Sequence, residues 1–332
     1  MIVARAPYRV SFFGGGTDYP EWYSEHGGSF LSLAINHYCY ITLRVKPPFQ
    51  EKRYRVSWRI AEDVNSIKSI KHPIVRHSLE TMNVNLGLDI TYTGDLPGGS
   101  GLGSSSAFTV ALNHSLHAAN GKKPNEYELA KEAYHIERDK LEETIGIQDQ
   151  IATAFGGFNH VIINKDGSYK LEKVLLTESQ IKKFLDRCLL VYTGISRLAS
   201  SVAEKKVEDI KNKVEIVTEM QDMVEEARSL LQSENYDEFG KLLHKNWLLK
   251  KSISDIVSTN DIDSIYDKAL KNGAIGGKLL GAGAGGFMLF FCEEGKKKKL
   301  IEIFDTKMVV PFQICEEGSK IVYEEEKNYG IL

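Results

Sequence analysis

Cysteine is scarce in this sequence, and its 332 residues contain only Cys39, Cys188, Cys292 and Cys315. These four lie far apart without the C-x-x-C spacing of zinc and redox sites, so we expect free thiols in a reducing compartment. Long apolar runs are also absent, and the longest strongly apolar stretch, FMLFFC at 287–292, is far too short to span a bilayer. Arg5, Pro7 and Arg9 interrupt the apolar start that a signal peptide needs. These absences predict a soluble cytoplasmic protein.

An excess of charge of either sign is missing too. The net charge is −3, with 26% charged and 42% hydrophobic residues, so nothing in the composition attracts nucleic acid or a membrane surface. The run Lys296 to Lys299 is interpreted as the solvated start of a helix rather than as a binding tail. The expected partner is a small molecule, and the oligomeric state stays open.

The order of the predicted elements indicates an α+β fold, and the length of 332 residues favours two domains. Residues 1–183 mix strands and helices without strict alternation. Strands are expected near 2–13, 30–46, 53–60, 88–93 and 157–163, and helices near 72–83, 104–120 and 126–140. Residues 184–332 begin with a strand and continue into long helices, whose apolar stripe runs from Val202 to Leu231.

The stretch PGGSGLGSSSAF, residues 97–108, holds four glycines and four serines between a predicted strand and a predicted helix. A helix N-terminus presents unpaired N–H groups, and glycines let a ligand approach the backbone closely, so this site suits an anion. No lysine of a Walker A loop occurs between Asp95 and Gly121, and serine stands where the third glycine of a dinucleotide loop belongs. The remaining alternative is a serine-capped helix after a tight turn.

Residues 96–107, LPGGSGLGSSSA, match the central motif of the GHMP kinases position by position, and the chain resembles this family. The glycine-rich stretch GGKLLGAGAGGFMLFF, residues 276–291, is similar to the family's third motif, which lies against the phosphate loop. The resemblance implies a two-domain GHMP-kinase-like fold, an active site in the cleft between the domains, and ATP as the phosphate donor. The residues expected to bind its phosphates are Pro97, Gly98, Gly99, Ser100, Gly101, Leu102, Gly103, Ser104, Ser105 and Ser106.

The segment APYRVSFFGGGTDY, residues 6–19, resembles the family's N-terminal sugar-site motif. Galactokinases carry Glu and His in this loop, whereas this chain carries GGGTDY. That form resembles the D-glycero-D-manno-heptose 7-phosphate kinases, which phosphorylate the anomeric hydroxyl of a sugar phosphate. The resemblance implies formation of the 1,7-bisphosphate for nucleotide-activated heptose biosynthesis, with Gly15, Gly16 and Asp18 at the substrate. Taken alone, Asp18 is an ordinary turn residue and Arg9 a surface strand residue.

The segment GIQDQIATAFGG, residues 146–157, is similar to the family's Gly-x-x-Asp-Gln element. The resemblance implies that Asp149 accepts the proton of the acceptor hydroxyl or orients that hydroxyl, and that Arg9 neutralises charge at the γ-phosphate. Taken alone, Asp149 is a good N-cap for the helix that follows.

Glu137 lies one helical turn from Ala133, on the apolar side of a predicted helix. A carboxylate in such a place needs a partner or a metal. The resemblance implies that Glu137 coordinates Mg²⁺ together with Ser105. The alternative is an exposed Glu137 paired with Lys140.

The segment YTGISRLASSVAEKK, residues 192–206, is the expected site for a phosphate at the far end of the acceptor. Arg197 can grip a phosphate with two N–H groups, and Ser200 and Ser201 add donors at the start of a helix. Similar segments occur in the heptose 7-phosphate kinases. The alternative places Arg197 on the surface beside a serine-capped helix.

Two other functions stay open at this point. One is another GHMP sugar kinase, acting on galactose, fucose or an N-acetylhexosamine. The other is a non-catalytic sugar-binding sensor on the same fold. A sensor has no need of a base and a metal pair, so Asp149, Glu137 and Ser105 favour a kinase.

Overall fold

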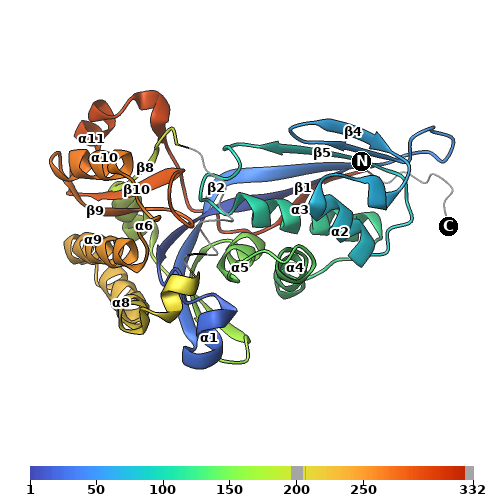
Figure 1. The fold of residues 1–332 in the computed structure, drawn as a ribbon. Helices are drawn as coiled ribbons and strands as arrows, with labels where there is room; N and C mark the ends of the chain where they lie inside the picture. Colours follow the sequence, from blue (N-terminus) through green and yellow to red (C-terminus); the bar gives the residue numbers. More distant parts are fainter. Residues whose placement is uncertain (196–204, 206, 326–332) are drawn as a thin grey trace.

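The computed structural model describes residues 1–195, 205 and 207–325, which form two sheets with helices packed on them (Figure 1). In this part of the chain the larger sheet has eight strands in the order β12, β1, β2, β5, β3, β4, with β6 paired to β2 and β7 to β6. These strands are β1 (Ile2–Phe13), β2 (Gly28–Val45), β3 (Tyr54–Ser57), β4 (Ala61–Val64), β5 (Leu88–Gly94), β6 (Phe158–Ile163), β7 (Tyr169–Lys173) and β12 (Lys320–Glu324).

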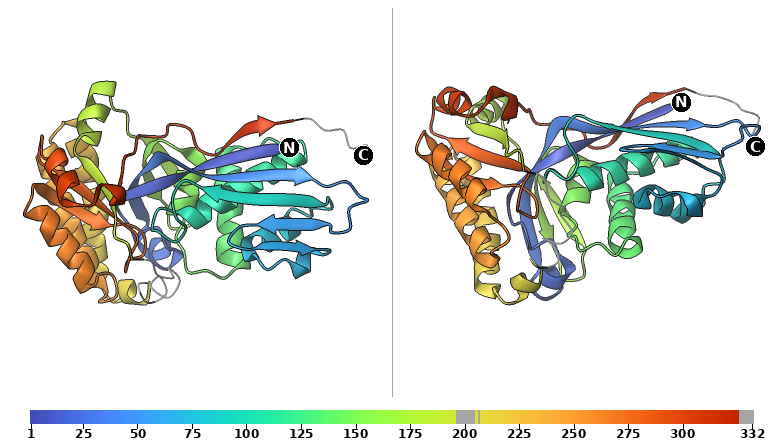
Figure 2. Two further views of the ribbon diagram at one scale, coloured as in Figure 1. Left: turned by 90° about the horizontal axis from the view of Figure 1, so that it is seen from above. Right: turned by 45° about the horizontal axis from the view of Figure 1, so that its top comes forward.

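Helices cover one face of the larger sheet, where α3 and α5 pack on β1 and β2 (Figures 1 and 2). α4 starts with a capping box, in which Asn125 and Glu128 each accept a hydrogen bond from the other's backbone N–H. The helices of this half are α1 (Pro20–His26), η1 (Ile67–Ser69), α2 (Pro73–Thr81), α3 (Ser104–Ala119), α4 (Glu126–Tyr134), η2 (His135–Lys140), α5 (Gln148–Phe155) and α6 (Glu178–Leu185).

The smaller sheet has the order β11, β8, β10, β9, and α9 lies directly on β9. The close approach requires glycine, because a Cβ on Gly276 would lie 2.1 Å from the carbonyl oxygen of Gly240 in α9. The elements of this half are β8 (Cys188–Tyr192), α8 (Val214–Gln232), α9 (Tyr236–Ile253), α10 (Asn260–Leu270), β9 (Ala274–Leu279), β10 (Phe287–Cys292), α11 (Lys297–Ile303), η3 (Thr306–Met308) and β11 (Val309–Val310). None of the helices in the described ranges has the length and apolar character of a membrane span.

The two sheets share one core. The ring of Phe184 lies 5.5 Å from Phe12 of β1, 5.6 Å from Phe239 of α9 and 5.6 Å from Phe291 of β10. The larger sheet also takes its edge strand β12 from the end of the described chain, where Glu324 pairs with Ile2. Both predicted halves of the chain therefore pack against each other through a shared core, and the second half also supplies a strand of the larger sheet.

Most predicted elements are confirmed, with two informative differences. The strand expected near 53–60 is present but shorter, because β3 ends at Ser57, where the chain turns into the hairpin of β3 and β4. The helix expected at 126–140 is α-helical only to Tyr134 and continues as the π-helix η2. The stripe expected from Val202 starts outside the described residues, and its later part lies on α8.

Candidate active site

A cavity of about 360 Å³ opens between the two sheets. Its walls come from five segments of the chain: β1 with the loop after it, the loop between β5 and α3 with the first turn of α3, the residues from η2 to α5, α9, and β9 with the turn after it. The residues that contribute side chains or backbone include Arg9, Gly15, Gly16, Asp18, Gly99, Gly101, Ser105, Glu137, Asp149, Lys250 and Lys278. Most predicted site residues of the first half thus lie around one space, but four of the predicted phosphate-binding residues are not among those that line it: Pro97, Gly98, Ser100 and Leu102. The side chain of Leu102 is instead fully buried in the core.

The loop between β5 and α3 is built on glycines in the left-handed region. Gly99, Gly101 and Gly103 have φ angles of 70°, 83° and 72°. Gly103 is the N-cap of α3 and makes no side-chain cap hydrogen bond, so the serine-capped alternative is wrong. Ser104 instead accepts from the N–H of Gly99 at 3.0 Å and closes the loop on itself. The arrangement leaves the N-terminus of a 16-residue helix at the cavity, where N–H groups can bind an anion.

The third glycine-rich motif presses on this loop. A Cβ on Gly101 would lie 2.5 Å from the carbonyl oxygen of Leu280, and one on Gly286 would lie 2.2 Å from the carbonyl oxygen of Ser100. The N–H of Phe287 donates to the same Ser100 oxygen at 3.1 Å. The expected contact between the two motifs is confirmed, and only glycine permits it.

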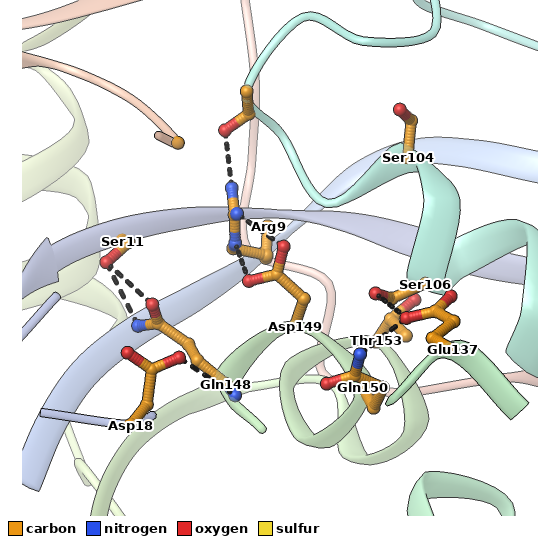
Figure 3. Close-up of polar contacts among 12 residues, drawn as sticks. Arg9, Ser11, Asp18, Ser104, Ser106, Glu137, Gln148, Asp149, Gln150 and Thr153 are labelled. Carbon is orange, nitrogen blue, oxygen red and sulfur yellow. Dashed lines mark hydrogen bonds and ion pairs between the residues drawn. The ribbon is translucent and has the colours of Figure 1, made fainter. Parts of the chain in front are cut away.

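Arg9 and Asp149 form a two-pronged ion pair inside the cavity (Figure 3). Nε of Arg9 donates to Oδ1 of Asp149 at 2.7 Å and Nη2 donates to Oδ2 at 2.6 Å, while Nη1 donates to the carbonyl oxygen of Gly101 at 2.5 Å. Arg9 is only 5% exposed, so its interpretation as a surface residue is wrong. The N-cap of α5 is Ile147, so the capping role of Asp149 is wrong as well.

Three consecutive side chains of α5 bind three different residues, two on β1 and one on η2 (Figure 3). Gln148 exchanges hydrogen bonds with Ser11 of β1 at 3.1 and 3.0 Å, Asp149 holds Arg9, and Gln150 donates to Glu137 at 2.5 Å. Successive residues of a helix point about 100° apart, which is why one short segment can serve three partners. This explains why a base candidate and a metal-ligand candidate lie in the same cavity.

Glu137 is buried, with 1% of its surface exposed, so the alternative of an exposed pair with Lys140 is wrong. Its carboxylate accepts from Thr109 at 2.5 Å, from Gln150 at 2.5 Å and from Ser106 at 2.8 Å. Burial raises the pKa of Glu137 to about 7, although these three hydrogen bonds oppose the shift. A buried carboxylate that faces a cavity and has hydroxyls beside it suits a hard cation, because Mg²⁺ prefers oxygen ligands.

The adjacent serines at the start of α3 have different surroundings. Ser106 is buried and donates to Glu137, whereas Ser105 is exposed and lines the cavity. Of the two predicted metal ligands, Ser105 therefore offers an accessible hydroxyl, and Glu137 offers a carboxylate that is held in place. The donor set fits Mg²⁺, and the pairing stays a prediction.

Asp18 fastens the predicted acceptor loop to α5. Its carboxylate accepts from the N–H of Gly16 at 3.1 Å. It also accepts from the N–H of Gln148 at 3.4 Å (Figure 3). Gly15 and Gly16 line the cavity beside it. The other predicted acceptor contacts, Arg197, Ser200 and Ser201, lie outside the described residues.

Two lysines were missed by the reasoning from sequence. Lys250 of α9 and Lys278 of β9 line the cavity and are 4% and 2% exposed. A signal existed for Lys278, because it is the one charged residue between the glycines and leucines of the third motif. Lys250 precedes Lys251 on a helix with many lysines, and its sequence offers no comparable signal.

Comparison with known proteins adds family information to this geometry. Residues 66–157 match the family model described as the GHMP kinases N terminal domain, and residues 227–310 match the GHMP kinases C terminal model. The chain is 32% identical to the D-glycero-alpha-D-manno-heptose 7-phosphate kinase of Campylobacter jejuni, over 96% of this chain and 98% of that protein. It is 27% identical to the galactokinase of Thermococcus kodakarensis, over 89% and 90%.

Solved structures agree with the fold. A D-glycero-D-manno-heptose 1-phosphate kinase from Bacteroides thetaiotaomicron superposes with a TM-score of 0.81 at 22% identity, over 98% of this chain and 100% of that one. A putative sugar kinase from Campylobacter jejuni gives a TM-score of 0.73 at 27% identity, over 96% and 97%.

Proposed function

Because the chain belongs to the GHMP kinases, we propose that it transfers a phosphoryl group from ATP to the anomeric hydroxyl of D-glycero-D-manno-heptose 7-phosphate. The product is the 1,7-bisphosphate, an intermediate on the way to nucleotide-activated heptose. One observation carries the proposal: Arg9 binds both Asp149, beside the acceptor loop, and the backbone of Gly101 in the phosphate loop. The phosphate donor ATP and the sugar acceptor then meet at the ion pair of Arg9 and Asp149.

The phosphate loop binds ATP through its backbone. The glycines at 99, 101 and 103 let the phosphates approach the N–H groups of the loop and of the first turn of α3. Glu137 and Ser105 would hold Mg²⁺, while Ser106, Thr109 and Gln150 keep the carboxylate of Glu137 in place. A bound Mg²⁺ would supply positive charge that offsets the negative charge of the phosphates during transfer.

Asp149 positions the acceptor and takes up or orients its proton. The two hydrogen bonds from Arg9 fix both carboxylate oxygens, and 28% of the side chain stays exposed toward the cavity. An anomeric hydroxyl is more acidic than an ordinary alcohol, so a modest base is sufficient. Arg9 also places positive charge next to Gly101. This charge stabilises the negative charge that accumulates on the phosphoryl group during its transfer.

The alternatives are another GHMP sugar kinase and a sugar-binding sensor. The experiment is a panel of sugars and sugar phosphates with ATP and Mg²⁺, read by ADP release, with Asp149→Asn as the matched control against contaminating activity. Fastest turnover with the heptose 7-phosphate supports the proposal. Faster turnover of galactose, fucose or an N-acetylhexosamine would reassign the substrate. Sugar-dependent thermal stabilisation without any ADP release would favour the sensor.

A further inference from the structure

The side-chain amide of Gln148 is buried at the wall of the cavity. Gln148 is 4% exposed and lines the cavity together with Ser11, which is 6% exposed. Oε1 of Gln148 accepts from Oγ of Ser11 at 3.1 Å, and Nε2 donates to the same oxygen at 3.0 Å. Among the described residues the amide makes no other hydrogen bond. One hydroxyl group therefore holds both polar atoms of the amide.

This contact uses only half of what the amide can bind. A glutamine side chain can make four hydrogen bonds, two through its N–H groups and two through its oxygen. Because Ser11 takes one position on each atom, one N–H and one oxygen lone pair of Gln148 remain. A sugar hydroxyl both donates and accepts, so it can bind at either position. Gln148 is thus held in a fixed orientation and keeps capacity for a neutral polar ligand.

Gln148 and its partner lie beside the predicted acceptor loop. The backbone N–H of Gln148 donates to the carboxylate of Asp18 at 3.4 Å. The chain just before it is pressed on the same residue, because a Cβ on Gly146 would lie 2.0 Å from Oδ2 of Asp18. A Cβ on Gly15 would lie 3.9 Å from Oγ of Ser11. The start of α5 and the acceptor loop are therefore packed together, and the amide is placed at their junction.

Asp149 separates Gln148 from the groups that are expected to bind phosphate and metal. A Cβ on Gly103 of the phosphate loop would lie 3.3 Å from Oδ2 of Asp149. Gln150, the next residue of α5, donates to Glu137. Successive residues of a helix point about 100° apart, and Figure 3 shows Gln148 and Glu137 on opposite sides of Asp149. A ligand that contacts both Asp149 and Gln148 is therefore the acceptor and not the nucleotide.

We propose that the amide of Gln148 binds the 2-hydroxyl of the sugar, and that Gln148 thereby selects acceptors that carry this group. The inference rests on the proposed function, in which Asp149 binds the anomeric hydroxyl. The 2-hydroxyl is on the ring carbon next to the anomeric carbon, and Gln148 is next to Asp149 on the side of the acceptor loop. A site built to bind a hydroxyl strongly rejects an analogue without it, because a buried polar group is then left unpaired.

The test compares Gln148→Met with the wild-type protein. Methionine keeps the length of the glutamine side chain and removes its amide, and thermal melting checks that the variant folds. Steady-state ADP release is measured with D-glycero-D-manno-heptose 7-phosphate and with its 2-deoxy form. Wild type should prefer the acceptor with the 2-hydroxyl at least tenfold in kcat/KM, and Gln148→Met should lower this preference at least tenfold. Loss of the 2-hydroxyl also changes the reactivity of the anomeric hydroxyl, but that effect is the same for every variant and cancels in the comparison.

Gln150→Met is the matched control. It removes an amide from the same helix, two residues further on, where the partner is Glu137. Turnover should therefore fall by the same factor with both acceptors, and the preference for the 2-hydroxyl should stay at the wild-type value.

Calorimetry without ATP gives a second readout that needs no turnover. Wild type should bind the 2-deoxy sugar at least tenfold more weakly than its parent, and Gln148→Met should bind the two alike. If Gln148→Met does not fold, Gln148→Leu takes its place. The inference is overturned if wild type treats both acceptors alike, if Gln148→Met keeps the preference, or if Gln150→Met loses it equally. Absence of ADP release from wild type with every sugar contradicts the proposed function, and calorimetry then still decides the role of Gln148.

Discussion

Replacing Glu137 by Gln should change how the stability of the protein depends on pH. The carboxylate is 1% exposed, and burial raises its pKa from the ordinary 4.5 to about 7. Gln has the same shape and carries no charge. Gln150 can adapt by turning its amide over, since its Oε1 is without a hydrogen-bond partner among the described residues. The substitution therefore removes one ionisation and little packing.

The direction of the pH effect on stability follows from comparing the pKa of Glu137 in the folded and unfolded chains. In the unfolded chain Glu137 loses its proton near pH 4.5, whereas in the folded protein it keeps the proton until about pH 7. Its contribution is fully present below pH 4.5 and is lost as pH rises through this window. The span is about 2.5 pH units, which at about 1.36 kcal/mol per unit is about 3 kcal/mol. Glu137→Gln should gain about this much stability relative to wild type between pH 4.5 and pH 8.

The assay is urea unfolding from pH 4.5 to 8 without metal, for wild type, Glu137→Gln and the exposed control Glu238→Gln. The quantity of interest is the difference from wild type, because partly buried His72, whose pKa burial lowers to about 4, affects the stability of both proteins at the acidic end of the range. Adding Mg²⁺ and ATP at pH 8 should stabilise wild type more than Glu137→Gln, since the cation needs the carboxylate. If the difference stays constant across the range, the raised pKa of Glu137 is refuted.

Three further substitutions test other parts of the site. Asp149→Ala should lower kcat by about 10² or more with little change in ATP affinity, the usual scale for losing a general base; a kcat within about threefold of wild type would exclude that role. Gly101→Ala should weaken ATP binding at least tenfold by calorimetry, because φ is 83° and the Cβ would lie 2.5 Å from Leu280. Gly121→Ala, with φ of 66° and open space around the Cβ, measures the backbone cost alone and should leave ATP affinity near wild type. Arg197→Ala should raise KM for heptose 7-phosphate tenfold or more, and an unchanged KM would remove Arg197 from the acceptor site.

Local patterns were sufficient to predict where the glycine- and serine-rich loop lies in the fold. A period-2 stretch followed by glycines, serines and a helical stretch indicated the junction of β5 and α3, and the structure has it at the predicted place. The absence of a Walker lysine and of a third glycine excluded two other nucleotide loops. The resemblance to a family then brought Arg9, Asp149 and Glu137 together, which no periodicity could have done.

The features that the sequence could not predict are the orientation of individual side chains and the contacts between residues far apart in the chain. Three serines in a row gave no indication that Ser106 turns inward to Glu137 while Ser105 stays accessible, because that depends on where the helix begins. Asp149 looked like an N-cap because its true partner, Arg9, is 140 residues away in the chain. Lys250 lines the cavity from α9, which packs closely on Gly276 of β9, and this is a tertiary contact that the local sequence does not reveal.

The π-helix at 135–140 makes the geometry of the site sensitive to the number of residues in this turn. A wide turn is visible in the hydrogen bonds, where the N–H of Leu141 donates to the carbonyl of Ile136 and that of Glu143 to the carbonyl of Glu137. Such a turn holds one residue more than an α-helical turn. Deleting one residue between α4 and Glu137 would turn Glu137 by about 100° about the helix axis, away from Thr109 and Gln150. A deletion of His135 or Ile136 should therefore abolish activity, whereas a conservative substitution at the same position should be tolerated.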